Sequence, residues 1–194
     1  MKSSTISITK NMFSKISVTA IVKDHLSTLK NNRTGKPHYP DIFLFIIFPA
    51  VIAGILVRGE VQLNDGLVNA LITSLSIFSA LLFNLLLLVY DISGKEASSR
   101  NTSNDPVERK KAVRKHALLR EIYINVSFSI LISTIAVVVL LGYFLKIDTP
   151  ATLTNVKLFQ IFPAVVYYLS IQFIFTLFMV LKRVYRLLAH SFEE

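Results

Sequence analysis

The chain has 194 residues, of which 53% are hydrophobic and only 17% are charged, and its formal net charge is +9. Ordinary soluble domains carry about 25% charged residues, so this composition is not that of a soluble enzyme or binding domain. The chain has no cysteine, which excludes disulfides, cysteine-ligated zinc and thiol nucleophiles.

The first predicted element lies in a polar, basic segment, residues 1–41. Apolar residues recur three or four positions apart between Met12 and Leu29, Val22 and Leu26 among them. This spacing predicts an amphipathic helix with lysines on or beside its polar side. The helix either lies on the membrane surface, with its lysines on anionic head groups, or packs on the rest of the cytosolic part.

Four further segments are predicted to span a membrane. The second carries the clearest signal, because Leu67–Val89 contains no charged side chain. As a helix this run covers about 35 Å, against a hydrocarbon core of about 30 Å. The first segment is short and contains Pro49 and Gly54. The predicted spans are residues 42–57, 67–90, 122–145 and 158–181.

The third helix is expected to start well before its span. Asp105 offers an N-cap, Pro106 suits the first helical position, and Glu108 completes a capping box. No helix breaker follows until Gly142, so the helix should run from about Pro106 to about Leu145. At a length of about 60 Å, its first turns must stand in water. By contrast, Gly94 is predicted to end the second helix, with a polar loop after it.

The distribution of positive charge predicts the topology. Most of the 21 lysines and arginines fall in residues 1–41, 91–121 and 182–194, and few fall in residues 58–66 and 146–157. By the positive-inside rule, the first three segments face the cytoplasm and the two short loops face the periplasm. The predicted fold class is therefore an all-α integral membrane protein with four transmembrane helices, an amphipathic N-terminal helix and cytosolic helix extensions.

Catalytic and transport chemistry is not expected. The predicted spans contain no Asp, Glu, Lys, Arg or His, whereas ion-coupled transporters keep an ionisable group inside the membrane. No metal, phosphate-binding or paired-carboxylate motif is present, so we expect no enzyme activity, no cofactor and no bound metal. We interpret the histidines as scattered cytosolic surface residues; they are His25, His38, His116 and His190.

Neutral polar residues form stripes on the predicted spans. In the second span the spacing of four, three, four and four residues places on one face Asn69, Thr73, Ser76, Ala80 and Asn84. Small and hydrogen-bonding side chains let helices approach and bond, either within a bundle or between copies, and a pore lining is the alternative. Asn84 lies deep in the span, where lipid offers its amide no partner. A second stripe, in the third span, comprises Asn125, Ser129 and Ser133, and a third stripe, in the fourth span, comprises Gln172 and Thr176. Three polar stripes in one small protein favour a homo-oligomer.

A basic run precedes the third span and comprises Arg109, Lys110, Lys111, Arg114, Lys115 and Arg120. It can anchor the chain on anionic lipid, or it can dock an acidic protein partner. No aromatic residues are interleaved with it, so direct nucleic-acid binding is not expected. Nearly half of the chain is predicted to be cytosolic, which favours a cytoplasmic partner.

Several stretches resemble a known family of small bacterial membrane proteins. They are Val22–Pro37 (VKDHLSTLKNNRTGKP), Asp41–Phe45 (DIFLF), Gly66–Phe78 (GLVNALITSLSIF) and Val89–Asp91 (VYD). With the size and four-span layout, they resemble the KwaA family, the membrane subunits of the Kiwa anti-phage defence system. The resemblance implies a homo-oligomer, possibly a tetramer, in the bacterial inner membrane, with both termini cytoplasmic. It further implies a sensor and scaffold that holds a KwaB-like, DNA-binding cytosolic effector. A channel-like effector that permeabilises the inner membrane is the alternative.

Overall fold

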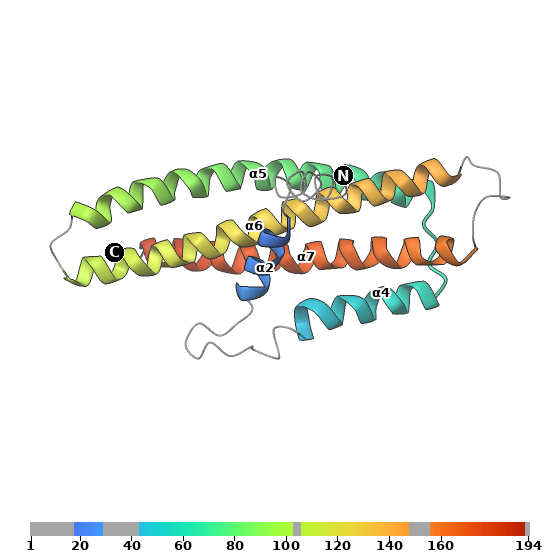
Figure 1. The fold of residues 1–194 in the computed structure, drawn as a ribbon, viewed down its shortest axis with the longest axis horizontal. Helices are drawn as coiled ribbons and strands as arrows, with labels where there is room; N and C mark the ends of the chain where they lie inside the picture. The colour runs from blue at the N-terminus through green and yellow to red at the C-terminus, as the bar shows by residue number, and fades with distance from the viewer. Residues whose placement is uncertain (1–17, 29–42, 103–105, 148–155, 193–194) are drawn as a thin grey trace, which may run out of the picture.

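The computed structural model describes residues 18–28, 43–102, 106–147 and 156–192. All regular structure in these ranges is helical, which confirms the predicted all-α class. The elements, in chain order (Figure 1), are α2 (Thr19–Thr28), the π-helical turn η1 (Phe43–Ile47), α4 (Phe48–Arg58), α5 (Asp65–Thr102), α6 (Pro106–Ile147) and α7 (Val156–Phe192).

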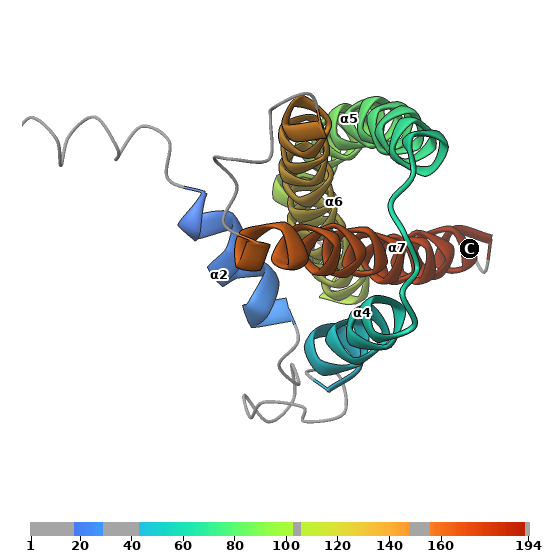
Figure 2. The same ribbon diagram turned by 90° about the vertical axis from the view of Figure 1, so that its right-hand side faces the viewer.

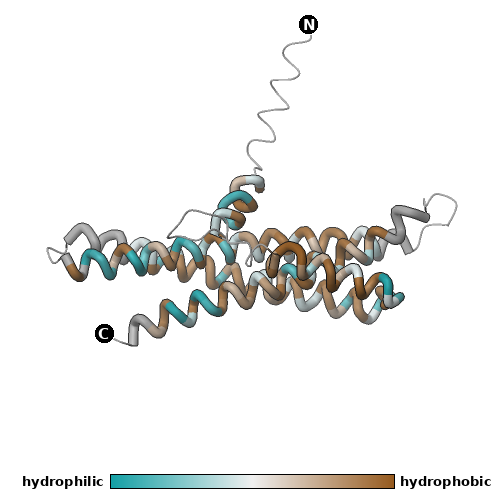
Figure 3. Tube along the Cα trace, turned by 90° about the horizontal axis from the view of Figure 1, so that it is seen from below, coloured by the Kyte–Doolittle hydropathy of each residue, from teal (hydrophilic) through white to brown (hydrophobic). Residues whose placement is uncertain are grey.

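Three of the helices are long and apolar enough to span a membrane. Their apolar stretches lie within Asp65–Lys95 of α5, Arg109–Tyr143 of α6 and Ile161–Ala189 of α7. Phe43–Arg58, formed by η1 and α4, is a shorter apolar helix. Hydropathy along the trace is highest in the middle of these helices. It falls at the end of the molecule where the chain passes from α5 to α6 (Figure 3).

The long helices pack in a row. The principal contacts join α5 to α6, α6 to α7, and α7 to α4. Viewed end-on, α5 and α4 lie at the two edges of this row (Figure 2). The α5 seam on α6 has a seven-residue spacing typical of paired helices, and its buried residues are Val68, Leu75, Leu82 and Val89. Because α5 is an edge helix, much of its remaining surface is exposed.

The turn between α4 and α5 has a defined backbone geometry. Glu60 takes the left-handed conformation with φ of 54°. The amide of Val61 donates to the carbonyl of Leu56, and the amide of Glu60 donates to the carbonyl of Val57, each at 3.2 Å. These two bonds form a Schellman motif, which satisfies carbonyls that the end of α4 would otherwise leave free.

Two further hydrogen bonds fix the position of this turn. The Tyr167 hydroxyl of α7 donates to the carbonyl of Val61 at 3.0 Å. The Oδ1 atom of Asn64 accepts the amide proton of Leu67 at 2.8 Å, which makes Asn64 the N-cap of α5. The turn is therefore joined to both neighbouring helices, and α5 starts with a conventional cap.

A proline explains the π-helical turn before α4. Pro49 lies in the first turn of α4, directly after η1. Its ring clashes with the carbonyl four residues earlier, at Phe45, and it has no amide proton to donate to that carbonyl. The chain accommodates the ring by widening the preceding turn to the π form.

The predicted end of the second helix at Gly94 is wrong, because α5 continues through Gly94 to Thr102. Glycine costs a helix only about 1 kcal/mol relative to alanine, and the next residues, Lys95–Ala97, are good helix formers. The predicted start of the third helix at Pro106 and its passage through Gly142 are confirmed by α6. Helices α5 and α6 thus both extend far beyond their apolar stretches.

The short helix α2 is oriented across the long helices, near the middle of their length (Figure 1). It packs on α6, far along the sequence. Residues 12–17 and residue 29 of the predicted N-terminal helix lie outside the described residues. The orientation of α2 differs from the predicted amphipathic pattern: Val22 and Leu26 are exposed, and His25 faces the protein.

Candidate functional site

The polar stripe of α5 lies on the outside of the helical row. All five of its members are exposed: Asn69, Thr73, Ser76, Ala80 and Asn84. The stripe begins one residue beyond the seam formed by Val68 and its heptad partners. One residue is a rotation of about 100° around a helix, so the stripe lies beside this seam rather than in it. The five residues share a face, as the spacing predicts, and this face is not covered by the chain's own described helices.

The other two polar stripes lie inside the row. Asn125, Ser129 and Ser133 of α6 and Thr176 of α7 are completely buried. Three of their hydroxyls bond to their own helices: Ser129 donates to the carbonyl of Asn125 at 2.9 Å, Ser133 to that of Ile130 at 2.9 Å, and Thr176 to that of Gln172 at 2.8 Å. These small residues allow close packing of α6 and α7 without leaving their hydroxyls unbonded.

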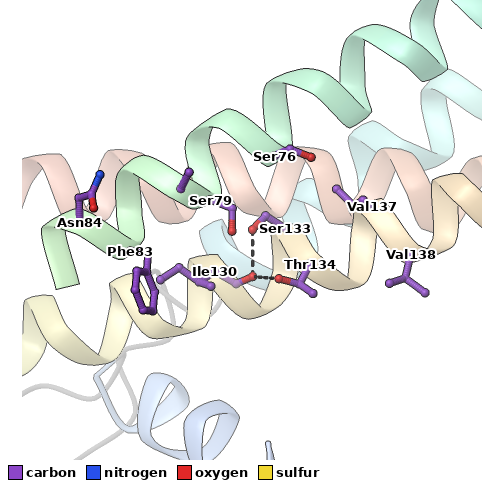
Figure 4. Close-up of a pocket in the computed structure, with 10 residues that line it drawn as sticks. Ser76, Ser79, Phe83, Asn84, Ile130, Ser133, Thr134, Val137 and Val138 are labelled. Carbon is purple, nitrogen blue, oxygen red and sulfur yellow. Dashed lines mark hydrogen bonds between the residues drawn. The ribbon is translucent and has the colours of Figure 1, made fainter. Parts of the chain in front are cut away.

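A groove of about 570 Å³ runs between α5 and α6 beside the exposed stripe (Figure 4). Polar side chains enter it from both helices: Ser76, Ser79 and Asn84 from α5, and Ser133 and Thr134 from α6. Apolar side chains such as Phe83 and Val138 complete its walls. The groove therefore combines hydrogen-bonding groups with an apolar surface along the exposed side of the row.

The basic run occupies the first turns of α6, where the helix extends beyond its apolar stretch. Arg109, Lys110, Lys111, Arg114 and Arg120 are exposed, and Lys115 is partly buried. At about 100° per residue these positions are distributed around the helix rather than along one face. Lys110 and Arg114 lie only about 40° apart and form the most compact exposed pair of the run. The structure thus gathers the predicted basic residues on one segment, without bringing them to one face.

A polar contact that the sequence interpretation missed lies where α2 crosses α6. His25 is only 1% exposed, so its interpretation as a surface histidine is wrong. Its Nδ1 atom lies 2.8 Å from Oδ1 of Asn125. The imidazole stacks on Phe128, with ring centroids 3.6 Å apart and planes 9° from parallel. The Thr28 hydroxyl also approaches Oδ1 of Asn125, at 3.3 Å. Asn125 and Phe128 on α6, which we call the α2 seat, therefore determine which face of α2 turns inward.

An ion pair borders this contact. The Nε atom of Arg183, on α7, lies 3.3 Å from the Oε2 atom of Glu121, on α6. A second Arg183 nitrogen donates to the Glu121 carbonyl at 3.2 Å. Asn125 lies one helical turn beyond Glu121, and its amide nitrogen donates to the same carbonyl at 2.7 Å. The contact thus joins α2, α6 and α7 at one level of the molecule.

Burial lowers the pKa of His25 from 6.5 to about 4. Desolvation is the largest cause, because removing a charged imidazolium from water is costly. The hydrogen bond to Asn125 opposes the shift, and the positive charge of Arg183 adds to it. His25 is therefore neutral at pH 7, which is the form that a nearly dry site favours. The sequence carried one usable signal: Ile21, His25 and Thr28 recur at helical spacing and form the inward face.

No group of three or more His, Cys, Asp and Glu side chains is positioned to hold a metal among the described residues. Searches against protein-family models, curated proteins and solved structures find no match for this chain.

Proposed function

We propose that the chain is the subunit of a homo-oligomeric scaffold in the bacterial inner membrane that recruits a cytosolic effector. Its four spans would be α5, α6, α7 and the shorter helix formed by η1 and α4. The resemblance to the KwaA family suggests a role in anti-phage defence, a tetramer and a KwaB-like, DNA-binding effector. Both termini and the α5–α6 connection would face the cytoplasm, as the distribution of lysine and arginine predicts.

The exposed stripe of α5 is the observation that carries the oligomer. Lipid hydrocarbon offers no hydrogen-bond partner to Asn84, Ser76 or Asn69, so these side chains gain by facing protein. The two other polar stripes are buried within the chain, but the α5 stripe is not. A second copy of the chain would supply hydrogen-bond partners for this stripe, so no other protein is needed to cover it.

The opposite edge of the row favours contact between like helices. From Phe48 to Val57, α4 contains no polar side chain. Packing α5 of one copy against α4 of the next would therefore leave the stripe without partners. Packing α5 against α5 places amide and hydroxyl groups opposite one another, and the groove beside Ser76 and Asn84 has room for side chains of the neighbouring helix. The copies would thus meet around an axis lined by α5.

Cysteine crosslinking tests this arrangement, because the chain has no native cysteine. We expect Ser76→Cys to give crosslinked oligomers in native membranes after treatment with a short, membrane-permeant bismaleimide. Ile174→Cys, at an exposed apolar position on α7, is the matched control and should stay monomeric on a denaturing gel. Equal crosslinking at both positions would indicate random collision and would reject α5 as the contact.

The basic run supports the recruiting role. Its residues occupy the first turns of α6, and all of them except Lys115 are exposed. Anionic lipid can bind the basic residues nearest the membrane, at about 1 kcal/mol each. Those nearer the α5–α6 connection project away from the apolar region, where an acidic surface of a cytosolic protein can reach them. No direct contact with nucleic acid is proposed.

A channel-like membrane effector is the second candidate, and the groove is the observation that favours it. If several copies turn α5 toward a common axis, Asn84 and Ser76 line that axis. Such a path would be neutral and polar, because the α5 stripe carries no charged side chain for ion selection. Conductance measurements on liposomes distinguish this function from a closed scaffold.

A further inference from the structure

The contact between α2 and α6 is built around one side chain. Val22 and Leu26 of α2 are exposed, whereas His25 is buried and Ile21 is half-buried. His25 supplies both the ring stack on Phe128 and the hydrogen bond to Asn125. Because so much of the contact depends on this imidazole, its state determines how firmly α2 is held.

The hydrogen bonds define which form of the imidazole fits. The amide nitrogen of Asn125 donates to the Glu121 carbonyl, so the Asn125 Oδ1 atom is left as an acceptor. Nδ1 of His25, at 2.8 Å from that oxygen, must therefore carry the proton. In the neutral ring Nε2 then holds a lone pair, and it is buried with no hydrogen-bond partner among the described residues.

A second proton, on Nε2, would find no hydrogen-bond acceptor among the residues that the structure describes. Glu121 on α6 is the nearby carboxylate, and its Oε2 atom is engaged by Arg183 of α7. The Arg183 charge itself disfavours a second positive charge at His25. On α2, the neighbouring Lys23 and Asp24 are exposed and differ in sign. A charged His25 thus gains little from its surroundings and loses its hydration in the α2 seat.

We propose that α2 is a reversible latch: neutral His25 holds α2 on α6, and protonation of the ring releases α2 and uncovers Asn125 and Phe128. Asn125 and Phe128 follow the basic run along α6, one to two helical turns beyond Arg120. This latch is a property of a single chain. It needs neither a second copy nor a cytosolic partner, so its failure would leave the proposed scaffold untouched.

The sign of the pH dependence follows from the two states of the latch. Undocked, His25 has the ordinary pKa of 6.5, and docked, its pKa is about 4. Docking is therefore at full strength above pH 6.5 and weakens as the pH falls toward 4, because the undocked state binds the proton more tightly. Within that window the docking equilibrium constant should decrease by up to about tenfold per pH unit.

Distances between spin labels measure the docked fraction directly. Lys23 on α2 and Arg186 on α7 are exposed, and K23C with R186C gives one labelled pair in an otherwise cysteine-free chain. In nanodiscs of zwitterionic lipid, we expect one narrow distance at pH 7.5 and a growing, longer and broader population by pH 4.5. A second pair, Y90C with R186C, reports whether the long helices keep their arrangement at low pH.

Two variants assign the response to His25. H25F keeps an aromatic ring for Phe128 but cannot gain a proton, so its distances should not change between pH 7.5 and 4.5. H116Q removes a histidine from α6 away from the latch and should respond as the unsubstituted chain does. If H25F docks α2 less firmly than the unsubstituted chain at every pH, a partly undocked H25F population that does not change with pH still assigns the pH dependence to His25.

Two outcomes overturn the latch. The first is an unchanged α2 distance in the unsubstituted chain from pH 7.5 to 4.5. The second is the same pH response in H25F as in the unsubstituted chain, since another group would then be responsible. A simultaneous change in the Y90C and R186C distance would mean that the whole helical row rearranges, which also rejects a local release of α2.

Discussion

Three amide side chains show how a polar residue is accommodated on an apolar helix. Asn125 is buried, and its side-chain amide makes hydrogen bonds at both ends. Its nitrogen donates to the Glu121 carbonyl, and its oxygen accepts from His25. Gln172 is also buried, between α7 and its neighbours, although its Oε1 atom has no partner in the described part of the chain. Asn84 is exposed on α5. The hydrogen bonds of Asn125 strengthen the fold of one chain, whereas Asn84 has hydrogen-bonding capacity to offer outside it.

Replacing Asn84 with leucine should weaken the association of copies. Hydrogen bonds between helices in membranes contribute about 0.6 to 1.7 kcal/mol, so we expect the dissociation constant to rise about three- to twentyfold. Dilution of donor- and acceptor-labelled protein in lipid vesicles, followed by energy transfer, measures this change. Phe178→Leu, at an exposed position on α7, is the control and should have no effect.

The same variant separates the two candidate functions. If the oligomer is a channel lined by α5, Asn84→Leu should abolish ion leakage from liposomes while oligomers persist. If the oligomer is a closed scaffold, the unsubstituted chain should show no leakage to abolish. An unchanged dissociation constant, together with no leakage from the unsubstituted chain, would show that Asn84 neither joins copies nor lines a channel.

At the level of helices, the sequence predicts where an element begins better than where it ends. A start depends on local chemistry that can be read directly, as at Pro106 with its preceding carboxylate. An end depends on what the helix packs against, and α5 continues through Gly94 beside α6 although glycine is a common terminator. The inward face of α2 was not predictable for the same reason, because the α2 seat lies far away in sequence.

The start of α5 gives a test at this level. Asn64→Ala removes the acceptor of the Leu67 amide, so the first turn of α5 should fray at a cost of about 1 kcal/mol. Hydrogen exchange at Leu67 should accelerate about fivefold, while the middle of α5 stays protected. Gln62→Ala, in the same turn, is the matched control. Equal exchange in both variants would show that the cap does not limit opening of the turn.

For the whole molecule, composition alone indicates a membrane protein, and the runs without charge locate the three long helices. The order of packing could not be obtained in this way. Every long helix presents an apolar surface, so periodicity does not reveal that α6 and α7 bury their polar stripes while α5 exposes its own. The distinction arises from position in the row: α6 has a neighbour on each side, whereas α5 has one.

The proposed recruitment of a cytosolic protein concerns the whole molecule and can be tested by charge reversal. Lys110→Glu with Arg114→Glu should abolish co-purification of a stoichiometric soluble partner from the native host in mild detergent. The control, Lys182→Glu with Arg186→Glu, reverses two exposed charges on α7 at the same side of the apolar region. Retained partner in the first variant, with normal insertion, would exclude this pair as the docking surface.

The unbroken passage of α6 from its basic turns into its apolar stretch has a mechanical consequence. From Pro106 to Glu121 the helix extends about 24 Å, and no proline or glycine interrupts it after the first residue. It therefore acts as a stiff lever rather than as a tethered loop. A tilt of about 10° in the apolar part would move the far end by roughly 4 Å, given that length. A small change in how the helices lie in the bilayer would thus become a displacement that a bound protein can register.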